Sequence, residues 1–352
     1  MKILITGGAG FIGTKLCREL IKAEHEIVTL DNFLPTVHKG TKPDIDNKVK
    51  IINGNVTNNE DWKTVFSDFS PEVVIHLAAE TGTGTSLTEP SLHTNTNVNG
   101  TALLIENLQK FNITPKKIIL TSSRAVYGEG AYEIDGTIKY PKTRELKNLE
   151  NELFDFKNSD GSNATFIPHN ASNTIVYPTN IYATTKLAQE HLLQNYTSAF
   201  EIPLNILRLQ NVYGEGQALG NPYTGILVQF MNAALADETI FIYENGGIIR
   251  DFVHVNDVVS AIKLCIQSSD PYFTVDIGTG VPLTVEEVAE KIIEITKSKS
   301  NLEYCNKFRL GDVRKAYADI SQANQVLGFE PATKIIQGLE SFMNWSRTSK
   351  QS

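Results

Sequence analysis

The glycines at positions 7, 10 and 13 restrict the fold of this chain more than any other feature. They follow a short apolar run over residues 2–6 and open a segment with helical spacing over residues 11–23. In such a strand–loop–helix unit, the first glycine allows a tight turn and the second lets backbone amides approach a pyrophosphate. The third allows the helix to pack closely on the strand. The pattern therefore predicts a parallel βαβ unit that binds a dinucleotide.

The rest of the chain continues the alternation of apolar runs and helical spacing. We expect strands at 26–30, 49–53, 72–77, 117–121 and 204–209, helices at 61–69, 97–111 and 180–200, and a returning strand near 273–277. Alternation of this kind predicts an α/β fold, a Rossmann-type doubly wound parallel sheet. We assign residues 1–211 to this dinucleotide-binding domain and residues 212–346 mainly to a smaller mixed α/β substrate domain.

Residues 129–177 interrupt the alternation. The segment is polar and rich in asparagine, and loops of this length inside a domain are usually lids or disordered insertions. Two interpretations stay open, an ordered or partly ordered flap over the substrate and a mobile surface insertion.

Composition excludes several classes of partner. The chain has 352 residues, 41% of them hydrophobic and 20% charged, with a net charge of −8 and no basic patch, so neither nucleic acid nor an anionic membrane is an expected partner. The three cysteines are far apart and form no Cys-x-x-Cys pair, so we expect no metal site and a reducing cytoplasm. The first residues predict a strand rather than a signal peptide, and no apolar run is long enough to cross a membrane.

Asp31 ends the second expected strand and indicates which dinucleotide is bound. Its carboxylate can accept hydrogen bonds from the adenine ribose hydroxyls and would repel a 2′-phosphate, and no arginine follows it immediately. The position therefore favours NAD over NADP. The alternative is an aspartate that only caps a helix.

Tyr182 and Lys186 lie four residues apart in an expected helix and so share one of its faces. A free tyrosine is a poor base at neutral pH, but a nearby ammonium lowers the pKa of its phenol. Ser122 and Ser123 end an expected strand, where sheets of this type bind ligands, and a hydroxyl there can hydrogen-bond a substrate oxygen. Taken singly, the pair is also compatible with an exposed helix face, and the serines with a turn.

Together these segments resemble the extended short-chain dehydrogenase/reductase family, and in particular its nucleotide-sugar epimerases, over nearly the whole chain. The resemblance includes Val74–Ala79, Asn97–Thr101 and Thr121–Gly128, and it implies Ser123, Tyr182 and Lys186 as the catalytic set. The residues it implies for NAD are Gly7, Gly10, Phe11, Ile12, Gly13, Asp31, Asn32, Asn55, Val56, Leu77, Ala78, Ala79, Asn97, Tyr182 and Lys186. One departure is Asn55, where the family usually has an aspartate.

The resemblance also implies a site for a nucleotide-diphosphate sugar. Its residues would be Glu80, Thr81, Ser123, Arg124, Asn211, Arg250, Arg309 and Asp312. Arginine suits phosphate because its planar fork forms paired hydrogen bonds. For Arg250, Arg309 and Arg314 the alternative is a surface ion pair.

Finer matches at 79–84, 122–130 and 221–227 resemble the 4-epimerases that act on dTDP-L-rhamnose, although Glu215 stands where those relatives carry proline. The implied reaction inverts C4 of a nucleotide-diphosphate hexose through a 4-keto sugar. A 4,6-dehydratase is the main competing reaction, but Arg124-Ala125 occupy the places of its Asp-Glu pair. A net reductase and a non-catalytic NAD-binding regulator also stay open. The resemblance further implies a homodimer formed by the helices at 97–111 and 180–200.

Overall fold

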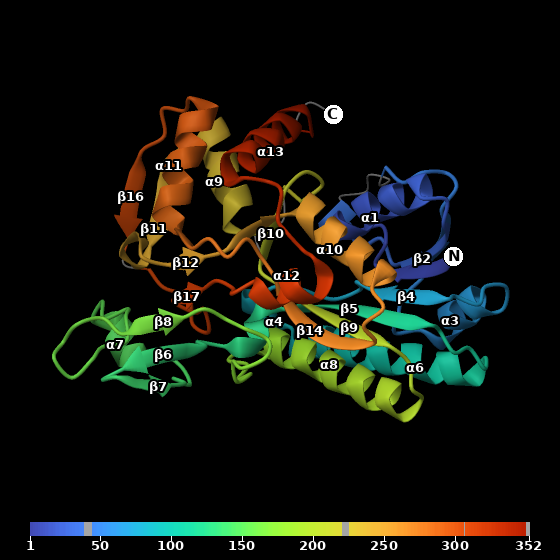
Figure 1. The fold of residues 1–352 in the computed structure, drawn as a ribbon. Coiled ribbons are helices and arrows are strands. Elements are labelled where there is room, and N and C mark those ends of the chain that lie inside the picture. The colour runs from blue at the N-terminus through green and yellow to red at the C-terminus, as the bar shows by residue number, and fades with distance from the viewer. Residues whose placement is uncertain (39–43, 220–224, 306, 350–352) are drawn as a thin grey trace.

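The computed structural model describes residues 1–38, 44–219, 225–305 and 307–349, and a seven-stranded sheet forms its centre (Figure 1). The strand order is β14-β9-β5-β4-β1-β2-β3, and every neighbouring pair is parallel. The strands are β1 (Lys2–Thr6), β2 (Glu26–Asp31), β3 (Lys50–Asn53), β4 (Val73–His76), β5 (Lys117–Ser123), β9 (Leu204–Leu209) and β14 (Tyr272–Ile277). The predicted doubly wound sheet is therefore confirmed, including its returning strand.

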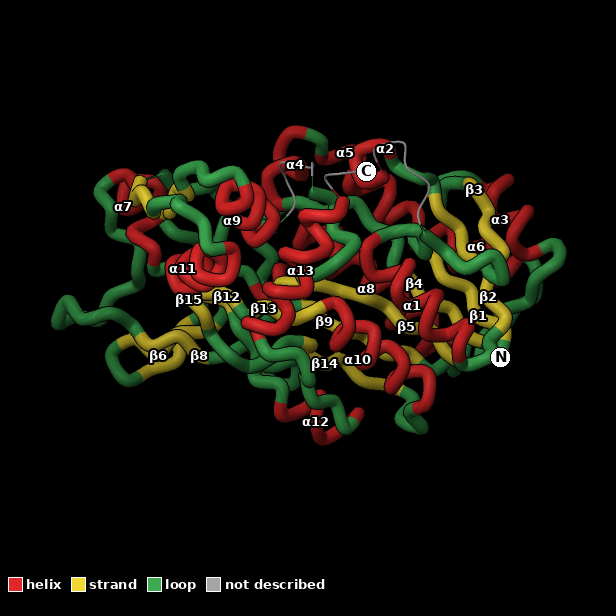
Figure 2. The backbone as a smooth tube through the Cα atoms, turned by 90° about the horizontal axis from the view of Figure 1, so that it is seen from above, coloured by secondary structure: helices red, strands yellow, loops and turns green. Residues whose placement is uncertain are grey.

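Helices cover both faces of this sheet because its strands are apolar on both sides. In β1, Ile3 and Ile5 pack into one layer and Leu4 into the other, as alternation along a strand requires. The first layer holds α1 (Phe11–Lys22), α10 (Val255–Gln267) and α12 (Ser321–Leu327), and Figure 2 shows α1 and α10 lying over the strands. The second holds α3 (Asn59–Phe66), α6 (Gly100–Lys110) and α8 (Ile181–Ala199).

A second group of elements forms its own core beyond the carboxyl ends of the strands (Figure 1). Its larger elements are α9 (Ile226–Leu235), β11 (Ile240–Tyr243), α11 (Val285–Thr296), β16 (Leu302–Cys305) and α13 (Ile335–Ser349). Short strands join it to the sheet, namely β10 (Asn211–Tyr213), β12 (Ile249–Arg250), β13 (Phe252–His254), β15 (Leu283–Thr284) and β17 (Lys315–Ala316). The chain then returns to the first group of elements through α10, β14 and α12. Of these three elements, the sequence predicted only the strand β14.

Residues 129–177 are ordered and form a small antiparallel sheet. Its elements are β6 (Ala131–Ile134), β7 (Thr137–Lys139), α7 (Leu146–Glu150) and β8 (Thr165–Ile167). Tyr132 and Phe166 are its buried centre, and Phe166 packs on Tyr317 with ring centroids 5.2 Å apart. The segment has an aromatic core shared with the chain beside β17, which favours the ordered interpretation over a mobile insertion.

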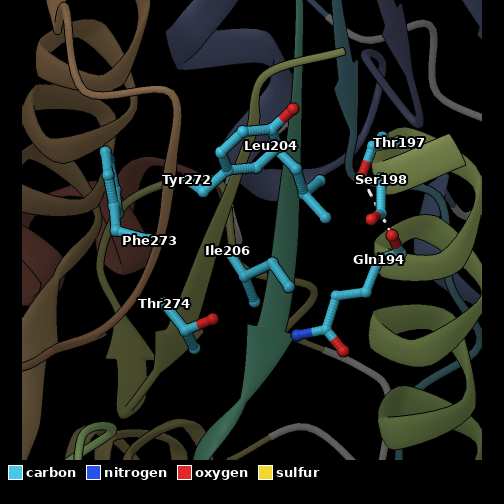
Figure 3. Close-up of a pocket in the computed structure, with 8 residues that line it drawn as sticks. All are labelled: Gln194, Thr197, Ser198, Leu204, Ile206, Tyr272, Phe273 and Thr274. Carbon is cyan, nitrogen blue, oxygen red and sulfur yellow. Dashed lines mark hydrogen bonds between the residues drawn. The ribbon is translucent and has the colours of Figure 1, made fainter. Parts of the chain in front are cut away.

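The remaining short helical segments lie in connections. They are α2 (Pro35–His38), α4 (Thr83–Thr88), α5 (Pro90–His93), the π-helical η1 (Thr94–Asn99), and the 3₁₀ turns η2 (Arg124–Tyr127) and η3 (Glu244–Gly246). A hollow of about 410 Å³ lies on the outer side of β9 and β14, against α8 (Figure 3). In the described ranges, no helix combines the length and the apolar character needed to cross a membrane.

Candidate active site

A cavity of about 930 Å³ lies where β1, β2, β4 and β5 end. The chain order runs outward from β1 to β3 on one side of the sheet and outward from β4 to β14 on the other. It therefore reverses between the neighbouring strands β1 and β4, and doubly wound sheets bind ligands at such a switch point. The cavity wall runs from the glycine loop to Arg250 and Asp312 in the second group of elements. One continuous space therefore joins the expected cofactor end to the expected substrate end.

The glycine loop is a tight cradle without room for side chains. Gly7 has a φ of +70°, and a Cβ on it would lie 2.9 Å from the backbone nitrogen of Ala78. A Cβ on Gly13 would lie 2.5 Å from the carbonyl oxygen of Gly7, so α1 packs directly on the loop. A pyrophosphate can approach such a bare backbone at a helix N-terminus, and the residues present therefore fit NAD.

Asp31 closes β2 beside this loop. Its carboxylate accepts one hydrogen bond from the backbone nitrogen of Ala9 at 2.9 Å and another from Phe33 at 2.9 Å. The side chain is 7% exposed and lines the cavity. The carboxylate is thus fixed at the edge where an adenine ribose would lie.

Most residues expected to hold the cofactor line the cavity. They are Gly7, Gly10, Phe11, Ile12, Gly13, Asp31, Asn32, Asn55, Val56, Leu77, Ala78, Ala79 and Tyr182. Asn97 does not belong to the described wall. Its side-chain oxygen accepts from the backbone nitrogen of Glu80 at 2.8 Å. Its side-chain nitrogen donates to the backbone oxygen of Glu80 at 3.0 Å and to the hydroxyl of Thr185 at 2.9 Å. Asn97, which lies in the π-helical turn η1, therefore shapes the wall from behind.

Tyr182 stands in the first turn of α8 and faces the cavity. Asn180 begins the helix, because its side-chain oxygen accepts from the backbone nitrogen of Ala183 at 2.8 Å. Burial raises the pKa of the Tyr182 phenol, while a hydrogen bond from Ser123 and the charge of Arg124 lower it. Ser123 ends β5 and is not itself among the described residues of the wall. The structure thus brings the predicted tyrosine and serine together.

Lys186 is 3% exposed and lies below the wall. Its ammonium donates to the side-chain oxygen of Gln189 at 2.6 Å, and Gln189 donates in turn to Thr101 at 2.8 Å. His76 continues this polar chain to β1, with 2.9 Å to Thr101 and 2.7 Å to Thr6. Burial lowers the pKa of Lys186 to about 7, because the surroundings disfavour a charged ammonium.

On the substrate side, Arg250 is held in place by an ion pair and by backbone oxygens. Its guanidinium lies 2.8 Å from Asp312 and donates to the carbonyl oxygen of Val313 at 2.8 Å. Arg309 packs over the ring of Tyr243, 5.5 Å from its centroid. The expected substrate residues that line the cavity are Glu80, Thr81, Arg124, Asn211, Arg250, Arg309 and Asp312. Only Ser123 of that set lies outside the described wall.

The cavity also has lining residues that were not predicted. At the cofactor end they include Leu34, Val37 and His38; at the other end they include Gln217, Ala218, Gly225, Ile226, Ile248 and Val285. The apolar members carry no sequence signal, because an aliphatic residue on a helix or strand predicts a core position. Of the matched segment at 221–227, residues 221–224 lie outside the described part of the chain.

Two other expectations need correction. Arg314 does not face the cavity; it is 3% exposed and pairs with Asp155 and Glu244. No described residue of the insertion 129–177 lines the cavity, which counts against the expectation of a flap over it. Instead, Arg144 of the insertion binds Glu244 and the carbonyl oxygen of Asp312, at 2.5 and 2.7 Å. The insertion therefore braces the substrate side from behind.

The comparisons with known proteins agree with this geometry. Residues 3–148 match the model of the NAD dependent epimerase/dehydratase family, and residues 163–342 match that of GDP-mannose 4,6 dehydratase. The chain is 41% identical over 348 residues to dTDP-L-rhamnose 4-epimerase from Burkholderia thailandensis, covering 98% of this chain and 94% of that one.

Two solved structures share the fold over almost the full length of both chains. The UDP-glucose 4-epimerase of Thermotoga maritima, solved with UDP-glucose, has a TM-score of 0.81 and 28% identity, and covers 99% of this chain and 100% of its own. The UDP-glucuronic acid 4-epimerase of Bacillus cereus, solved with UDP-glucuronic acid and NAD, has a TM-score of 0.79 and 24% identity, with coverage of 99% and 100%.

Proposed function

Because this chain belongs to the NAD-dependent epimerase/dehydratase family within the extended short-chain dehydrogenases/reductases, we propose that it inverts C4 of a nucleotide-diphosphate hexose. It is an isomerase and its cofactor is NAD. The observation that supports the reaction most directly is the position of Tyr182. This tyrosine lines the cavity that also holds the glycine loop at one end and Arg250 with Asp312 at the other.

The chemistry that NAD supplies when bound is reversible hydride transfer at C4 of the sugar. Tyr182, as a phenolate, accepts the proton of the C4 hydroxyl and later returns it to the same oxygen. Ser123, whose hydroxyl lowers the pKa of that phenol, steadies the oxygen. The 4-keto sugar turns about its diphosphate linkage between the two proton transfers, so that its opposite face is presented.

Arg250, Asp312, Arg309 and Asn211 are the residues we assign to the nucleotide diphosphate and the sugar. A guanidinium already oriented by Asp312 loses little conformational freedom when it binds a phosphate, which favours tight positioning. Lys186 stays assigned to the nicotinamide ribose, for which it must leave Gln189. We keep the division into domains at residues 1–211 and 212–346, the homodimer and the cytoplasmic location as proposals.

The dehydratase reaction has support from the second family model but lacks its chemistry in this chain. Elimination of water across C5 and C6 needs an acid and a base beyond Tyr182, and the residues after Ser123 are Arg124 and Ala125. Glu80 also lines the cavity, and burial raises its pKa. The lack of an acid pair directly after Ser123 favours the epimerase.

For the sugar, we propose dTDP-L-rhamnose as the first substrate to test, on the strength of the full-length similarity to the Burkholderia enzyme. The purified protein would be incubated without added NAD with dTDP-L-rhamnose, UDP-glucose, UDP-N-acetylglucosamine and UDP-glucuronate, and the products identified by NMR. A C4 epimer at equilibrium supports the proposal, whereas a 4-keto-6-deoxy product would show a dehydratase. Tyr182→Phe is the matched control, which should keep its fold and lose at least about a hundredfold in kcat.

A further inference from the structure

The insertion at residues 129–177 is attached to one segment of the substrate side, residues 312–319, which runs through β17. In Figure 1 the strand β8 of the insertion lies beside β17, and Phe166 of β8 packs on Tyr317. The backbone nitrogen of His169 also donates to the carbonyl oxygen of Tyr317 at 2.9 Å. The insertion therefore holds residues 312–319, which we call the supported segment, by packing as well as by hydrogen bonds.

Arg144 links the insertion directly to a residue of the cavity wall. Its Nη2 donates to the backbone carbonyl oxygen of Asp312 at 2.7 Å. Its guanidinium is also held by two carboxylates, that of Glu244 at 2.5 Å and that of Glu129 at 3.3 Å. The side chain is 5% exposed, so water competes little for these contacts. Arg144 therefore has little freedom to move, and it fixes the main chain at Asp312.

Two further contacts attach the supported segment to the insertion two residues beyond Asp312. The backbone nitrogen of Arg314 donates to the carboxylate of Glu129 at 3.2 Å, and its guanidinium forms an ion pair with Asp155 at 2.9 Å. Glu129 and Asp155 both belong to the insertion, and Arg314 is buried. The beginning of the supported segment is thus held through its main chain and through a side chain.

The same part of the segment holds Arg250, the arginine that we assign to the nucleotide diphosphate. The guanidinium of Arg250 donates to the carboxylate of Asp312 at 2.8 Å. It also donates to the carbonyl oxygens of Val313 and Arg314, at 2.8 and 3.2 Å. Arg250 and Asp312 both line the cavity. A chain of contacts therefore runs from Arg144 through Asp312 to Arg250, and a shift of the supported segment would shift the guanidinium.

We propose, on the basis of the proposed function, that the insertion sets the affinity of the enzyme for the nucleoside diphosphate part of its substrate, with Arg144 as a positioning residue. Arg144 is not among the described residues of the wall. It acts through Asp312, whose position determines where the guanidinium of Arg250 meets a phosphate. A guanidinium that is held before binding loses little conformational freedom when a phosphate binds. The insertion therefore acts on substrate binding rather than on hydride or proton transfer.

The first test is calorimetric titration of the NAD-loaded enzyme with UDP and with dTDP. The test variant combines Arg144→Met with Glu244→Gln, because Arg144→Met alone would leave a buried carboxylate without this partner. The Kd of the variant should rise about three- to tenfold, the effect expected when one long side chain must become ordered during binding. An unchanged Kd for UDP and dTDP overturns the inference.

The Kd for NAD, measured on the protein freed of cofactor, separates positioning from a general loss of structure. It should be the same in the double variant and in the wild type, because neither Arg144 nor Glu244 is among the described residues of the wall. A parallel rise in the Kd for NAD would overturn the positioning role. Lys139→Met is the matched control, because Lys139 lies in the same insertion, is 52% exposed and pairs with Asp135. This control should bind NAD and the nucleoside diphosphates as the wild type does.

Kinetics with the sugar found by NMR give a second readout. The double variant should show a rise of about three- to tenfold in KM with an unchanged kcat, because Tyr182 is not part of this chain of contacts. A loss of kcat without a rise in KM would contradict the inference.

Hydrogen exchange of the wild type tests the same inference should the double variant not fold. Binding of UDP or dTDP should slow exchange in residues 143–150, which carry Arg144 and α7, although these residues do not belong to the described wall. Exchange in the hairpin of residues 134–139 should stay unchanged. Equal exchange of residues 143–150 with and without the nucleotide would overturn the inference.

The two proposals fail separately. If the wild type binds UDP or dTDP and epimerises a sugar, but the variant keeps the wild-type Kd and KM, the inference alone is overturned. If the wild type converts no nucleotide sugar, yet binds UDP or dTDP more tightly than the variant does, the proposed function fails and the role of the insertion stands. If the wild type binds neither nucleoside diphosphate, both are overturned.

Discussion

The ammonium of Lys186 and the side-chain oxygen of Gln189 form a buried hydrogen bond of 2.6 Å. Gln189 is itself held by Thr101, and Thr101 by His76, whose pKa is lowered by burial to about 3. The lysine therefore ends a chain of neutral polar groups that runs from Thr6 of β1 through His76 of β4 and α6 to α8. Such a chain satisfies its hydrogen bonds but leaves the charge of the ammonium poorly stabilised.

We expect this buried lysine to give the protein a distinctive stability profile between neutral and alkaline pH. Burial lowers the pKa of Lys186 from 10.5 to about 7, so in this window the unfolded chain binds more protons than the folded one. Stability should therefore rise with pH from about 7 to about 10, by at most about 1.4 kcal/mol per unit. Urea unfolding of the wild type and Lys186→Met at several pH values measures it. The variant should lack this rise. Equal slopes of stability against pH in the wild type and the variant would contradict the burial of a neutral lysine.

Replacement of Asp31 tests the assignment of the ribose end. Asp31→Asn has one acceptor oxygen in place of two, so the bonds from Ala9 and Phe33 compete with the ribose hydroxyls for it. Loss of one hydrogen bond to a charged group costs about 1.5–3 kcal/mol, so the affinity for NAD should fall about tenfold or more. Calorimetric titration of the protein freed of cofactor with NAD and with NADP measures the affinity for each dinucleotide. Unchanged affinity for NAD would place the ribose elsewhere.

Arg144 should be among the residues on which the stability of the substrate side depends most. It is 5% exposed and lies between Glu129 and Glu244, and burial raises the pKa of Glu129 to about 7. Arg144→Met leaves buried carboxylates without their partner, for which about 3–5 kcal/mol of destabilisation is typical. The free energy of unfolding in urea gives the value.

A double variant separates this charge effect from simple loss of packing. Arg144→Met combined with Glu244→Gln removes both members of the pair and should recover part of the lost stability. If the destabilisation of the double variant equals the sum of the destabilisations of the two single variants, the interaction between Arg144 and Glu244 contributes nothing to stability.

Glu215 should tie the two groups of elements together. It pairs with Lys15 of α1 at 2.7 Å and also hydrogen-bonds Ser341 of α13. Burial raises the pKa of Glu215, but the bonds from Lys15 and Ser341 outweigh it and bring the value from 4.5 to about 2. The pair therefore stabilises the fold above about pH 4.5, and that contribution is lost as the pH falls towards about 2.

Thermal unfolding of Glu215→Gln at neutral and acid pH checks this prediction. The deficit against the wild type should be present at neutral pH and shrink as the pH falls below about 4. Glu238→Gln, at an exposed glutamate, is the control and should show no deficit. A deficit of Glu215→Gln that does not depend on pH would show that the carboxylate charge is unimportant.

The sequence was sufficient for the large sheet, because its central strands are apolar runs that are buried on both faces. Val74, Ile118 and Ile206, for example, are at most 1% exposed, and such runs are recognisable without any knowledge of their neighbours. The glycine loop was predictable for a related reason. Gly7 needs a positive φ and Gly13 a close helix approach, and both requirements are local.

What the sequence did not predict depends on contacts between distant segments. Strands β12, β15 and β17 have two residues each, too few for any periodicity. The return of α10 and α12 to the first core follows from packing against α1 and the sheet, which no local pattern records. The same holds for the contacts of Arg144 with Glu244 and of Arg314 with Glu129 and Glu244, which join residues about 70 to 185 positions apart in the chain.

Within the site, the residue types were predictable but their contacts were not. Spacing placed Tyr182 and Lys186 on one helical face, yet the structure turns the lysine towards Gln189. Ile226, Ile248 and Val285 line the cavity although their sequence context is that of a core. Whether an apolar residue lines a cavity or packs in a core depends on the arrangement of the whole cavity.

The central claim is that the sugar is oxidised and reduced at C4 within one closed site, with Tyr182 moving the proton. The most direct measurement follows a substrate that carries deuterium at C4 during repeated epimerisation in ordinary water, with NMR and mass spectrometry of both epimers. The account predicts that the label remains at C4 in both epimers, because the C4 hydrogen returns to the carbon it left. Replacement of the label by hydrogen from water, together with inversion at C4, would contradict it.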